Sequence, residues 1–325
     1  MIAKNQEIFQ VMNEMGSKRE PFIFIIDFNC ERPEVIPLDV AAENGIYFHI
    51  GTYRNKPQPK EERKVLHFRK NSIDFTFYEQ AYEKVLHYIN RGDTYLLNLT
   101  FPTEIDCNYN LEEIFDYTHA KYKLLYKDEF VIFSPETFVR IDNGCIYSYP
   151  MKGTIDAGIV DARAIIFGDP KETAEHNTIV DLIRNDLSRI SQNVRVTKFR
   201  YLEEIRTNFK TLLQLSSEIR GELPLNYHEH LGDILQALLP AGSISGAPKK
   251  KTVEIIHEVE NYKRGFYTGV CGIFDGNKLD SGVMIRYIEN TDKGMVFKSG
   301  GGITFLSEAP MEFQELIDKV YVPIV

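Results

Sequence analysis

Apolar runs and alternating apolar and polar residues predict a chain that is rich in strands. Residues 22–28 form a nearly continuous apolar run of Phe and Ile, and residues 45–51 and 65–68 alternate on either side of a polar loop. The same patterns predict strands at residues 95–101, 130–133, 137–141, 145–149, 267–274, 278–289 and 294–299. Because neighbouring strands are joined by short loops, we expect antiparallel pairing.

Helices are predicted where apolar residues recur about every 3.6 positions. Residues 78–90 place apolar side chains on one face, and Gly92 follows the expected end of this helix. Further helices are expected at residues 172–190, 231–239, 252–259 and 310–321, with Gly300, Gly301 and Gly302 forming a turn before the last one. Groups of strands separated by helices indicate an α+β fold. The chain contains no polar linker long enough to separate two domains, so residues 1–325 are expected to form a single domain.

Composition narrows the class of protein. The 325 residues include 38 Lys and Arg against 47 Asp and Glu, which gives a formal net charge of −9 at pH 7. A surface of this charge does not favour nucleic-acid binding. The four cysteines lie far apart, and their spacing matches neither a disulfide framework nor a zinc site. No segment approaches the ~20 apolar residues of a membrane span or resembles a signal peptide, so a reducing, cytoplasmic location is expected.

Two pairs of glutamates stand three residues apart, so the members of each pair project from one face of a helix. Glu172 and Glu175 open one predicted helix, and Glu312 and Glu315 open another, followed one turn later by Lys319. Such a pair is more often a solvated helix start than a binding site. If the two pairs meet, four carboxylates need a cation, and an all-oxygen site suits Mg²⁺ better than Zn²⁺. The sequence alone does not show whether they meet.

Three further segments are candidates for chemistry. Residues 239–249 lack the glycine spacing of a nucleotide phosphate loop; they fit either a loop that approaches a small ligand, with Ser243 as a donor, or a structural turn into a helix. The consecutive glycines at 300–302 favour close approach of backbone N–H groups to an anionic ligand. Lys152 follows a predicted strand, where a lysine is usually a solvated cation. In a pocket it can instead lose its proton and act as a nucleophile, with a partly buried Glu136 as general acid.

Taken together, these segments resemble the chorismate-utilising enzymes, which include anthranilate, aminodeoxychorismate, isochorismate and salicylate synthases. The resemblance covers residues 90–320 in the family's order of motifs. The matching segments are GDTYLLNLT, SPETF, PMKGT, KETAEHNTIVDLIRNDLSRI, LLPAGSISGAPK, KRGFYTGVCG, MIRY and GGGITFLSEAPMEFQELIDK. The PxxGT element carries lysine in aminodeoxychorismate synthases and typically alanine in anthranilate synthases, and here it holds Lys152. The resemblance is therefore closest to component I of the aminodeoxychorismate synthases, with anthranilate synthase component I as the alternative.

The resemblance implies roles for the candidate residues. Lys152 would be the nucleophile that adds to the chorismate ring, and Glu136 the acid that protonates the departing hydroxyl group. Ammonia would then displace the lysine and give 4-amino-4-deoxychorismate, a precursor of p-aminobenzoate and folate. Glu175 and Glu315 would bind Mg²⁺ directly, and Glu172 and Glu312 directly or through water. The implied substrate contacts are Arg286, Tyr267, Lys319, Gly301 and Gly302 for carboxylates, and Gly153, Thr154 and Ser243 elsewhere in the pocket.

The family fold consists of two large, mostly antiparallel sheets packed face to face, with helices outside and the active site in the cleft between them. The resemblance implies the same α+β architecture here, with a short β-rich portion at residues 1–75. No segment resembles a glutaminase, so a separate glutamine amidotransferase subunit is the expected source of ammonia, in a heterodimer. A non-catalytic chorismate-binding subunit and an isochorismate synthase are the remaining interpretations.

The sequence departs from the family pattern at three places. Gln214 stands where the family often has a histidine, so no acid–base role is transferred to it. Leu96 replaces a common glutamine, and the N-terminal portion lacks the LLES element of feedback-inhibited anthranilate synthases. Tryptophan regulation is therefore expected to be absent or altered.

Overall fold

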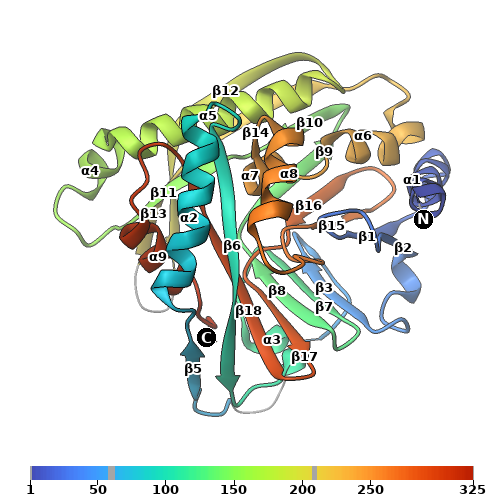
Figure 1. The fold of residues 1–325 in the computed structure, drawn as a ribbon. Helices are drawn as coiled ribbons and strands as arrows, with labels where there is room; N and C mark the ends of the chain where they lie inside the picture. The colour runs from blue at the N-terminus through green and yellow to red at the C-terminus, as the bar shows by residue number, and fades with distance from the viewer. Residues whose placement is uncertain (1, 58–62, 207–210, 325) are drawn as a thin grey trace.

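Two large antiparallel sheets, A and B, dominate the computed structural model, which describes residues 2–57, 63–206 and 211–324 (Figure 1). Sheet A contains, in spatial order, β11 (Met151–Asp156), β13 (Thr211–Glu222), β10 (Cys145–Ser148), β9 (Thr137–Asp142), β16 (Leu279–Val283), β15 (Val270–Phe274), β1 (Phe22–Ile26) and β2 (Glu34–Pro37), with β12 (Gln192–Arg206) also paired to β13. Sheet B contains β14 (Gly246–Ala247), β6 (Leu96–Cys107), β18 (Gly294–Ile303), β17 (Tyr287–Thr291), β8 (Phe130–Ser134), β7 (Tyr122–Tyr126), β3 (Ile46–Ile50) and β4 (Tyr53–Arg54), with β5 (Phe68–Asn71) paired to β6.

Helices cover the outer faces of these sheets. They are α1 (Ile2–Ser17), α2 (Phe75–Asn90), α3 (Leu111–Tyr117), α4 (Ala162–Gly168), α5 (Pro170–Ser188), α6 (Leu231–Leu238), α7 (Gly242–Ser245), α8 (Lys249–Val259) and α9 (Ala309–Asp318), with short 3₁₀ turns at Leu38–Val40 and Tyr227–His230. The helix α5 packs on β11, β12 and β13, whereas α2 packs on β6, α8 and α9 (Figure 1). No helix in the described part of the chain is long and apolar enough to cross a membrane.

The apolar core lies between the sheets and beneath the helices. Ile23 and Ile273 of sheet A pack against Phe48 and Tyr126 of sheet B in one buried cluster. A second, larger cluster joins the apolar faces of α2, α5, α6 and α8 to the strands that they cover. Burial of these faces is what fixes each helix on its sheet.

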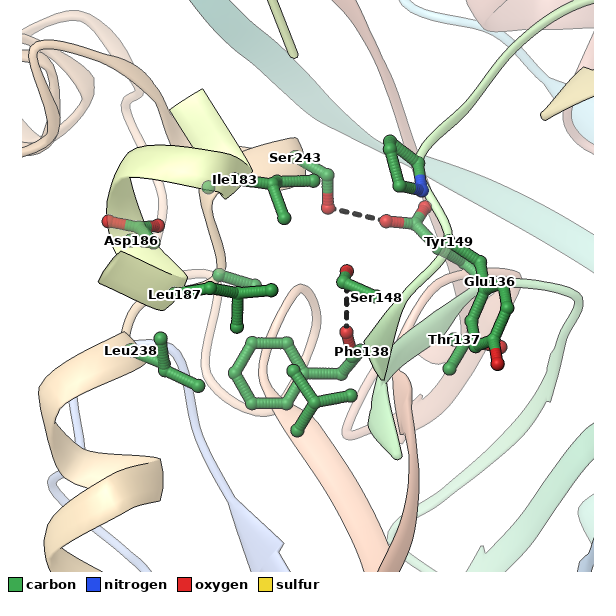
Figure 2. A pocket seen from close by; sticks show the side chains of 14 residues that line it. Glu136, Thr137, Phe138, Ser148, Tyr149, Ile183, Asp186, Leu187, Leu238 and Ser243 are labelled. Atoms are coloured by element: carbon green, nitrogen blue, oxygen red, sulfur yellow. Dashed lines mark hydrogen bonds between the residues drawn. The ribbon is translucent and has the colours of Figure 1, made fainter. Parts of the chain in front are cut away.

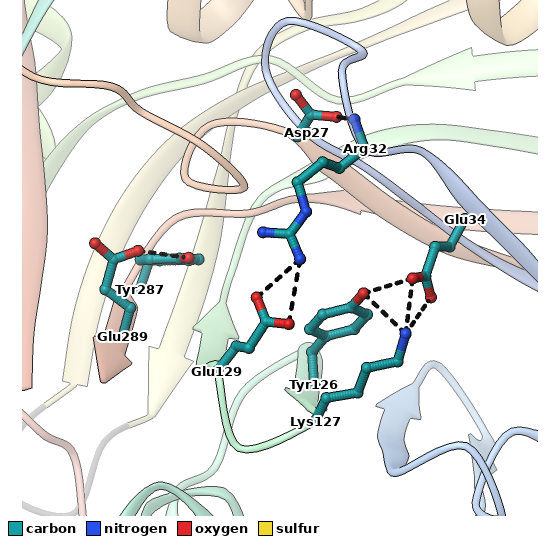
Figure 3. A network of polar contacts seen from close by, with 8 residues as sticks. All are labelled: Asp27, Arg32, Glu34, Tyr126, Lys127, Glu129, Tyr287 and Glu289. Atoms are coloured by element: carbon teal, nitrogen blue, oxygen red, sulfur yellow. Dashed lines mark hydrogen bonds and ion pairs between the residues drawn. The ribbon is translucent and has the colours of Figure 1, made fainter. Parts of the chain in front are cut away.

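A polar network ties the N-terminal edge of sheet A to the β7–β8 turn of sheet B (Figure 3). Arg32 contacts both carboxylate oxygens of Glu129, at 3.2 and 3.0 Å. Glu34 accepts hydrogen bonds from Lys127 and from the Tyr126 hydroxyl, both at 2.7 Å. These contacts are largely exposed, so they help to align the two sheets but contribute little to stability.

The chain passes from one sheet to the other at two adjacent points. β8 of sheet B continues into β9 of sheet A through Pro135 and Glu136, and β16 of sheet A continues into β17 of sheet B through residues 284–286. The two crossings are hydrogen-bonded to each other, because Phe133 N donates to Arg286 O and Val283 N donates to Glu136 O, each at 3.1 Å. Glu136 and Arg286 are therefore held side by side where the sheets meet.

The predicted α+β fold with two antiparallel sheets is confirmed, but two local predictions are wrong. Residues 278–289 are not one strand, because the chain leaves sheet A after Val283, takes a φ of +52° at Arg286 and enters sheet B at Tyr287. The predicted glycine turn is also wrong, since Gly300, Gly301 and Gly302 are part of β18, paired with residues 98–100 of β6. An apolar alternation continues through a change of sheet, so it could not reveal where the change occurs.

The remaining differences are at the ends of elements and in segments without a clear pattern. The strand predicted at residues 65–68 overlaps β5 only at Phe68. The elements that were not predicted are helices α1, α3, α4 and α7 and strands β2, β4, β7, β11, β12, β13 and β14. The failure to predict β11 matters most for the site, because this strand carries Lys152 and Gly153.

Candidate active site

The carboxyl group of Glu136 lies at the crossing between the sheets and faces α7. The Ser243 hydroxyl in α7 donates a short hydrogen bond to Glu136 Oε1. Burial raises the pKa of the Glu136 carboxyl above its ordinary value, although the hydrogen bond from Ser243 acts in the opposite direction. The positive charges of Arg286, Lys319 and Lys152 also lower it, so all three cations lie near this carboxyl.

A small cavity of about 30 Å³ lies behind the Glu136–Ser243 hydrogen bond (Figure 2). Its walls are mainly apolar, from Phe138, Val139, Ile183, Leu187 and Leu238, with Asp186 and Tyr149 at its margin. It has room for about two water-sized molecules. Glu136 and Ser243 are therefore part of the wall of this cavity.

Lys152 projects from β11 and forms an ion pair with α5. Its Nζ lies 2.5 Å from Glu175 Oε2, and the Glu175 side chain is only 3% exposed. The next residue, Gly153, has a φ of +78° at an irregularity in the β11–β13 register. A Cβ at Gly153 would lie 3.2 Å from Glu172 Oε2, so the glycine allows β11 to approach α5 closely.

The charge on Lys152 is stabilised by both glutamate pairs. Although burial opposes it, the carboxylates of Glu175, Glu172 and Glu315 raise the pKa of Lys152 above its ordinary value. Burial also raises the pKa of Glu172, and Lys152 acts against that rise. Glu172 and Glu175 of one pair and Glu315 of the other, which are far apart in sequence, thus act on the same ammonium group.

The four carboxylates fit a hard divalent cation in their chemistry, although they are not gathered tightly. Glu172 Oε2 is buried and accepts no hydrogen bond from the described residues. An oxygen of this kind is a suitable ligand for Mg²⁺. Within the described ranges, no three acidic, histidine or cysteine side chains are close enough together to hold a metal ion. Lys152 lies among these carboxylates and pairs with Glu175.

The glycines of β18 form the floor beside α9. A Cβ at Gly301 would lie 3.6 Å from Glu312 Oε2 and 3.9 Å from Lys319 Nζ, whereas one at Gly302 would lie 3.9 Å from Lys152 Nζ. Lys319 Nζ donates to Gly300 O at 2.8 Å and pairs with Glu315 at 2.7 Å. Burial lowers the pKa of Lys319, which Glu315 counteracts. Glu312 is buried, although the sequence placed it on the polar face of its helix.

Arg286 and Tyr267 complete the cationic side of the site. Arg286 Nε is buried and donates to no acceptor in the described part of the chain, and the guanidinium lies 5.5 Å from the Tyr321 ring. Tyr267 is buried next to Tyr287, with ring centroids 5.8 Å apart. Burial raises the pKa of Tyr267, so its hydroxyl remains a hydrogen-bond donor at neutral pH. A carboxylate could accept hydrogen bonds from both residues.

Thr154 is not brought to the centre with the other predicted residues. Its side chain is exposed in β11, and its partner across the strand pair is Gln214. The Gln214 side chain is buried in β13. Gly153, Lys152 and the glutamates of α5 converge, whereas Thr154 lies at the margin.

A buried ion pair behind the site was missed in the sequence. Arg264 bonds to both carboxylate oxygens of Glu260, at 2.8 and 2.7 Å. It also donates to Ile244 O at 2.9 Å, to Asn98 O at 2.6 Å and to the Thr268 hydroxyl at 3.3 Å. These acceptors are next to Ser243, opposite Gly302 and next to Tyr267, respectively. The pair lies beyond the end of α8 at Val259, so no helical spacing in the sequence could have indicated it.

His176, next to Glu175, was also missed. Its Nε2 lies 2.7 Å from the Ser217 hydroxyl of β13, and burial lowers the pKa of the ring to about 4. The neutral ring thus connects α5 to sheet A directly beside the carboxylate that holds Lys152.

The chain and its fold belong to a known class of protein. The family model for chorismate binding enzymes matches residues 27–324. The chain therefore belongs to the chorismate binding enzymes.

Its relatives fall into two groups. An uncharacterised PabA-like protein of Pasteurella multocida is 51% identical over 97% of this chain and 98% of its own length. An uncharacterised PabA-like protein of Haemophilus influenzae is 49% identical over 98% of this chain and 97% of its own length. The aminodeoxychorismate synthase component 1 of Bacillus subtilis is 32% identical over 75% of this chain and 54% of its own length. The anthranilate synthase component 1 of Aquifex aeolicus is 32% identical over 74% of this chain and 51% of its own length.

Solved structures share the fold. A putative 2,3-dihydroxybenzoate-specific isochorismate synthase from Bacillus anthracis superposes with a TM-score of 0.71 at 19% identity, covering 98% of this chain and 87% of that one. The anthranilate synthase component I of Streptococcus pneumoniae superposes with a TM-score of 0.66 at 29% identity, covering 81% and 61%.

Proposed function

We propose that the chain is component I of an aminodeoxychorismate synthase, an enzyme that replaces a ring hydroxyl group of chorismate with an amino group. The observation that carries the proposal is the position of Lys152, whose Nζ lies 2.5 Å from Glu175 and near the Glu136 carboxyl. The amine needed for addition to the ring and the acid needed for loss of the hydroxyl group are thus in one site.

In the proposed reaction, the Lys152 ammonium group releases its proton to solvent, and the resulting amine forms a C–N bond to the chorismate ring. The ring double bonds shift, and the C–O bond opposite the ring carboxylate breaks. Glu136, whose pKa is raised by burial, donates the proton that makes the leaving group water. Ammonia then forms a C–N bond at the carbon that lost the oxygen, the Lys152 amine leaves, and the proton lost by ammonia returns to Glu136.

The substrate is a dianion, so it needs positive charge in a site that also contains carboxylates. Mg²⁺ held by Glu172, Glu175, Glu312 and Glu315 would offset the ring carboxylate and draw electron density from the ring. Arg286 and Tyr267 would hold the enolpyruvyl carboxylate, which suits the free Nε donor of Arg286. The remaining proposed contacts are Lys319, the backbone amides of Gly301 and Gly302, and Gly153, Thr154 and Ser243 at the pocket wall.

Anthranilate synthase component I is the second candidate. Relatives with that name match this chain at the same 32% identity as those named aminodeoxychorismate synthase. Such an enzyme would place nitrogen on a different ring carbon and release pyruvate. Lys152 argues against it, because that reaction has no need for an amine beside the ring.

The proposed nitrogen source is ammonia delivered by a separate glutamine amidotransferase subunit, and the proposed setting is cytoplasmic p-aminobenzoate and folate biosynthesis. The water-sized cavity behind Glu136 supports a small, uncharged nucleophile. The chain alone is therefore expected to use ammonium salts and not glutamine.

The test is to incubate the purified chain with chorismate, Mg²⁺ and ammonium at alkaline pH, with and without an aminodeoxychorismate lyase. We expect p-aminobenzoate only when the lyase is present, and none when glutamine replaces ammonium or when the variant Lys152→Ala replaces the natural chain. Mass spectrometry and fluorescence identify the product. Anthranilate as the product would overturn the proposal in favour of the second candidate, and no turnover would indicate a chorismate-binding subunit.

A further inference from the structure

The ion pair between Lys152 and Glu175 is placed where a divalent cation would bind. Glu175 is 3% exposed, and the Lys152 side chain is 25% exposed. A carboxylate buried to this extent needs a positive charge beside it. In the structure that charge is an ammonium group of the chain itself.

The second carboxylate of α5 is part of the same arrangement. Glu172 Oε2 is buried without a hydrogen bond from the described residues, and a Cβ at Gly153 would lie 3.2 Å from it. Glu172 also acts electrostatically on Lys152, as does Glu315 of α9. Lys152 is therefore the shared counter-ion of carboxylates from two helices.

A divalent cation and this ammonium group cannot use the same oxygen atoms. Lys152 Nζ lies 2.5 Å from Glu175 Oε2, an oxygen that the cation would also use. A cation at Glu172 and Glu175 would also repel an ammonium group only a few ångströms away. Occupation by one therefore disfavours occupation by the other.

We propose that Lys152 and the divalent cation compete for the carboxylates of Glu172 and Glu175, so that cation binding releases Lys152 from α5. The inference rests on the metal site of the proposed function and adds a coupling between that site and the nucleophile. The coupling is reciprocal: whatever removes Lys152 from Glu175 tightens cation binding by the same factor by which the cation loosens the ion pair.

When Lys152 is released, it can move toward the glycines of β18, because it lies between them and α5. A Cβ at Gly302 would be 3.9 Å from Lys152 Nζ, so the amine is already beside β18. Once it is displaced from Glu175, Nζ has the space over these glycines available. Cation binding thus prepares the chain for the nucleophilic step before chorismate arrives.

The first test measures cation binding without chorismate, by calorimetry with Mg²⁺ and by paramagnetic resonance with Mn²⁺. We expect the variant Lys152→Met to bind both ions about tenfold more tightly than the natural chain, a coupling of ordinary size. Lys152→Arg keeps the positive charge and should bind them with nearly natural affinity. Lys249→Met is the matched control, because Lys249 is similarly buried and pairs with Asp186 of the same helix at 2.7 Å; its cation affinity should be unchanged.

A second test uses the natural chain, in case a variant does not fold. Lys152 should react several-fold faster with an amine-acylating reagent when Mg²⁺ is present at constant pH and ionic strength, as mapped by peptide mass spectrometry, whereas Lys249 should not change. Equal or weaker cation binding by Lys152→Met, or equal labelling with and without Mg²⁺, would overturn the proposal. If the coupling is found but no aminated product is formed, the competition holds and the proposed function fails. If aminated product is formed but no coupling is found, the proposed function holds and the competition fails.

Discussion

Glu136 is an acid whose strength is set by opposing neighbours. Burial raises the pKa of its carboxyl, and the Ser243 hydroxyl lowers it by donating a hydrogen bond to the charged form. A group that donates a proton is active below its pKa, so loss of protonated Glu136 should appear as the alkaline limb of the pH profile. The position of that limb therefore depends in part on a single side chain of α7, Ser243.

The variant Ser243→Ala should move this limb to higher pH. Without the hydrogen bond, the pKa of Glu136 rises further, and the carboxyl keeps its proton over a wider range. The measurement is kcat/KM for chorismate as a function of pH at saturating ammonium. Ser148→Ala is the matched control, because Ser148 lines the same cavity but donates to Phe138 O at 3.1 Å. An unchanged limb, or one at lower pH, in Ser243→Ala would contradict this assignment.

At the level of single residues, type and spacing selected several groups that the structure places close together. Glu172, Glu175 and Glu315 all act on the Lys152 ammonium group, and Lys152 acts in turn on the Glu136 carboxyl. Thr154 shows the limit of the approach, because its exposure depends on the register irregularity at Gly153. No residue pattern reports such a shift of register.

At the level of elements, β18 illustrates how the same residue type serves two purposes. A Cβ at Gly300 would lie 2.5 Å from Thr100 Cγ2 and 2.7 Å from Leu99 O, so this position has no room for a side chain. A Cβ at Gly301 would meet only Glu312 and Lys319, at ordinary contact distances. Gly300 thus permits strand packing, whereas Gly301 leaves space for a ligand.

Gly300→Ala and Gly301→Ala should consequently fail in different ways. Gly300→Ala should lower the free energy of unfolding by about 1–3 kcal/mol through overpacking. Gly301→Ala should keep nearly natural stability and raise KM for chorismate at least about tenfold, because the methyl group takes substrate space. Urea unfolding and steady-state kinetics distinguish the two. Equal destabilisation by both substitutions would contradict the separation of roles.

The sequence predicted these glycines as a turn, and the reason for the error is general. Three glycines usually mark a bend because they form no packing contacts and cost chain entropy. In β18 the neighbouring strand β6 supplies the constraint instead, through register contacts at residues 98–100. That constraint comes from a segment 200 or more residues away in the chain, so the local pattern could not contain it.

At the level of the whole molecule, the site depends on both sheets being in place. Glu136 and Arg286 are positioned by the two crossings, Lys152 by sheet A, and the glycine floor by sheet B. The sequence suggested both glutamate pairs but could not show that glutamates of α5 and α9 act on the same lysine, because that arrangement follows from strand order. Arg264 is the residue that spans these parts, since it binds Glu260, the backbone next to Ser243 and opposite Gly302, and the Thr268 hydroxyl next to Tyr267.

Removing Arg264 should therefore damage stability and catalysis together. Arg264→Met leaves the 1% exposed Glu260 carboxylate without its partner, which should cost about 3–5 kcal/mol of unfolding free energy. Arg32→Met is the control, because the Arg32–Glu129 pair is 59% and 44% exposed and should contribute at most about 1 kcal/mol.

The double variant Glu260→Gln/Arg264→Met should regain part of the stability, since no buried charge is left alone. It should still have a raised KM for chorismate, because Ile244 O and Asn98 O lose the same donor that aligned Ser243 and Gly302. Recovery of both stability and KM in the double variant would show that Arg264 only neutralises Glu260 and does not position the site.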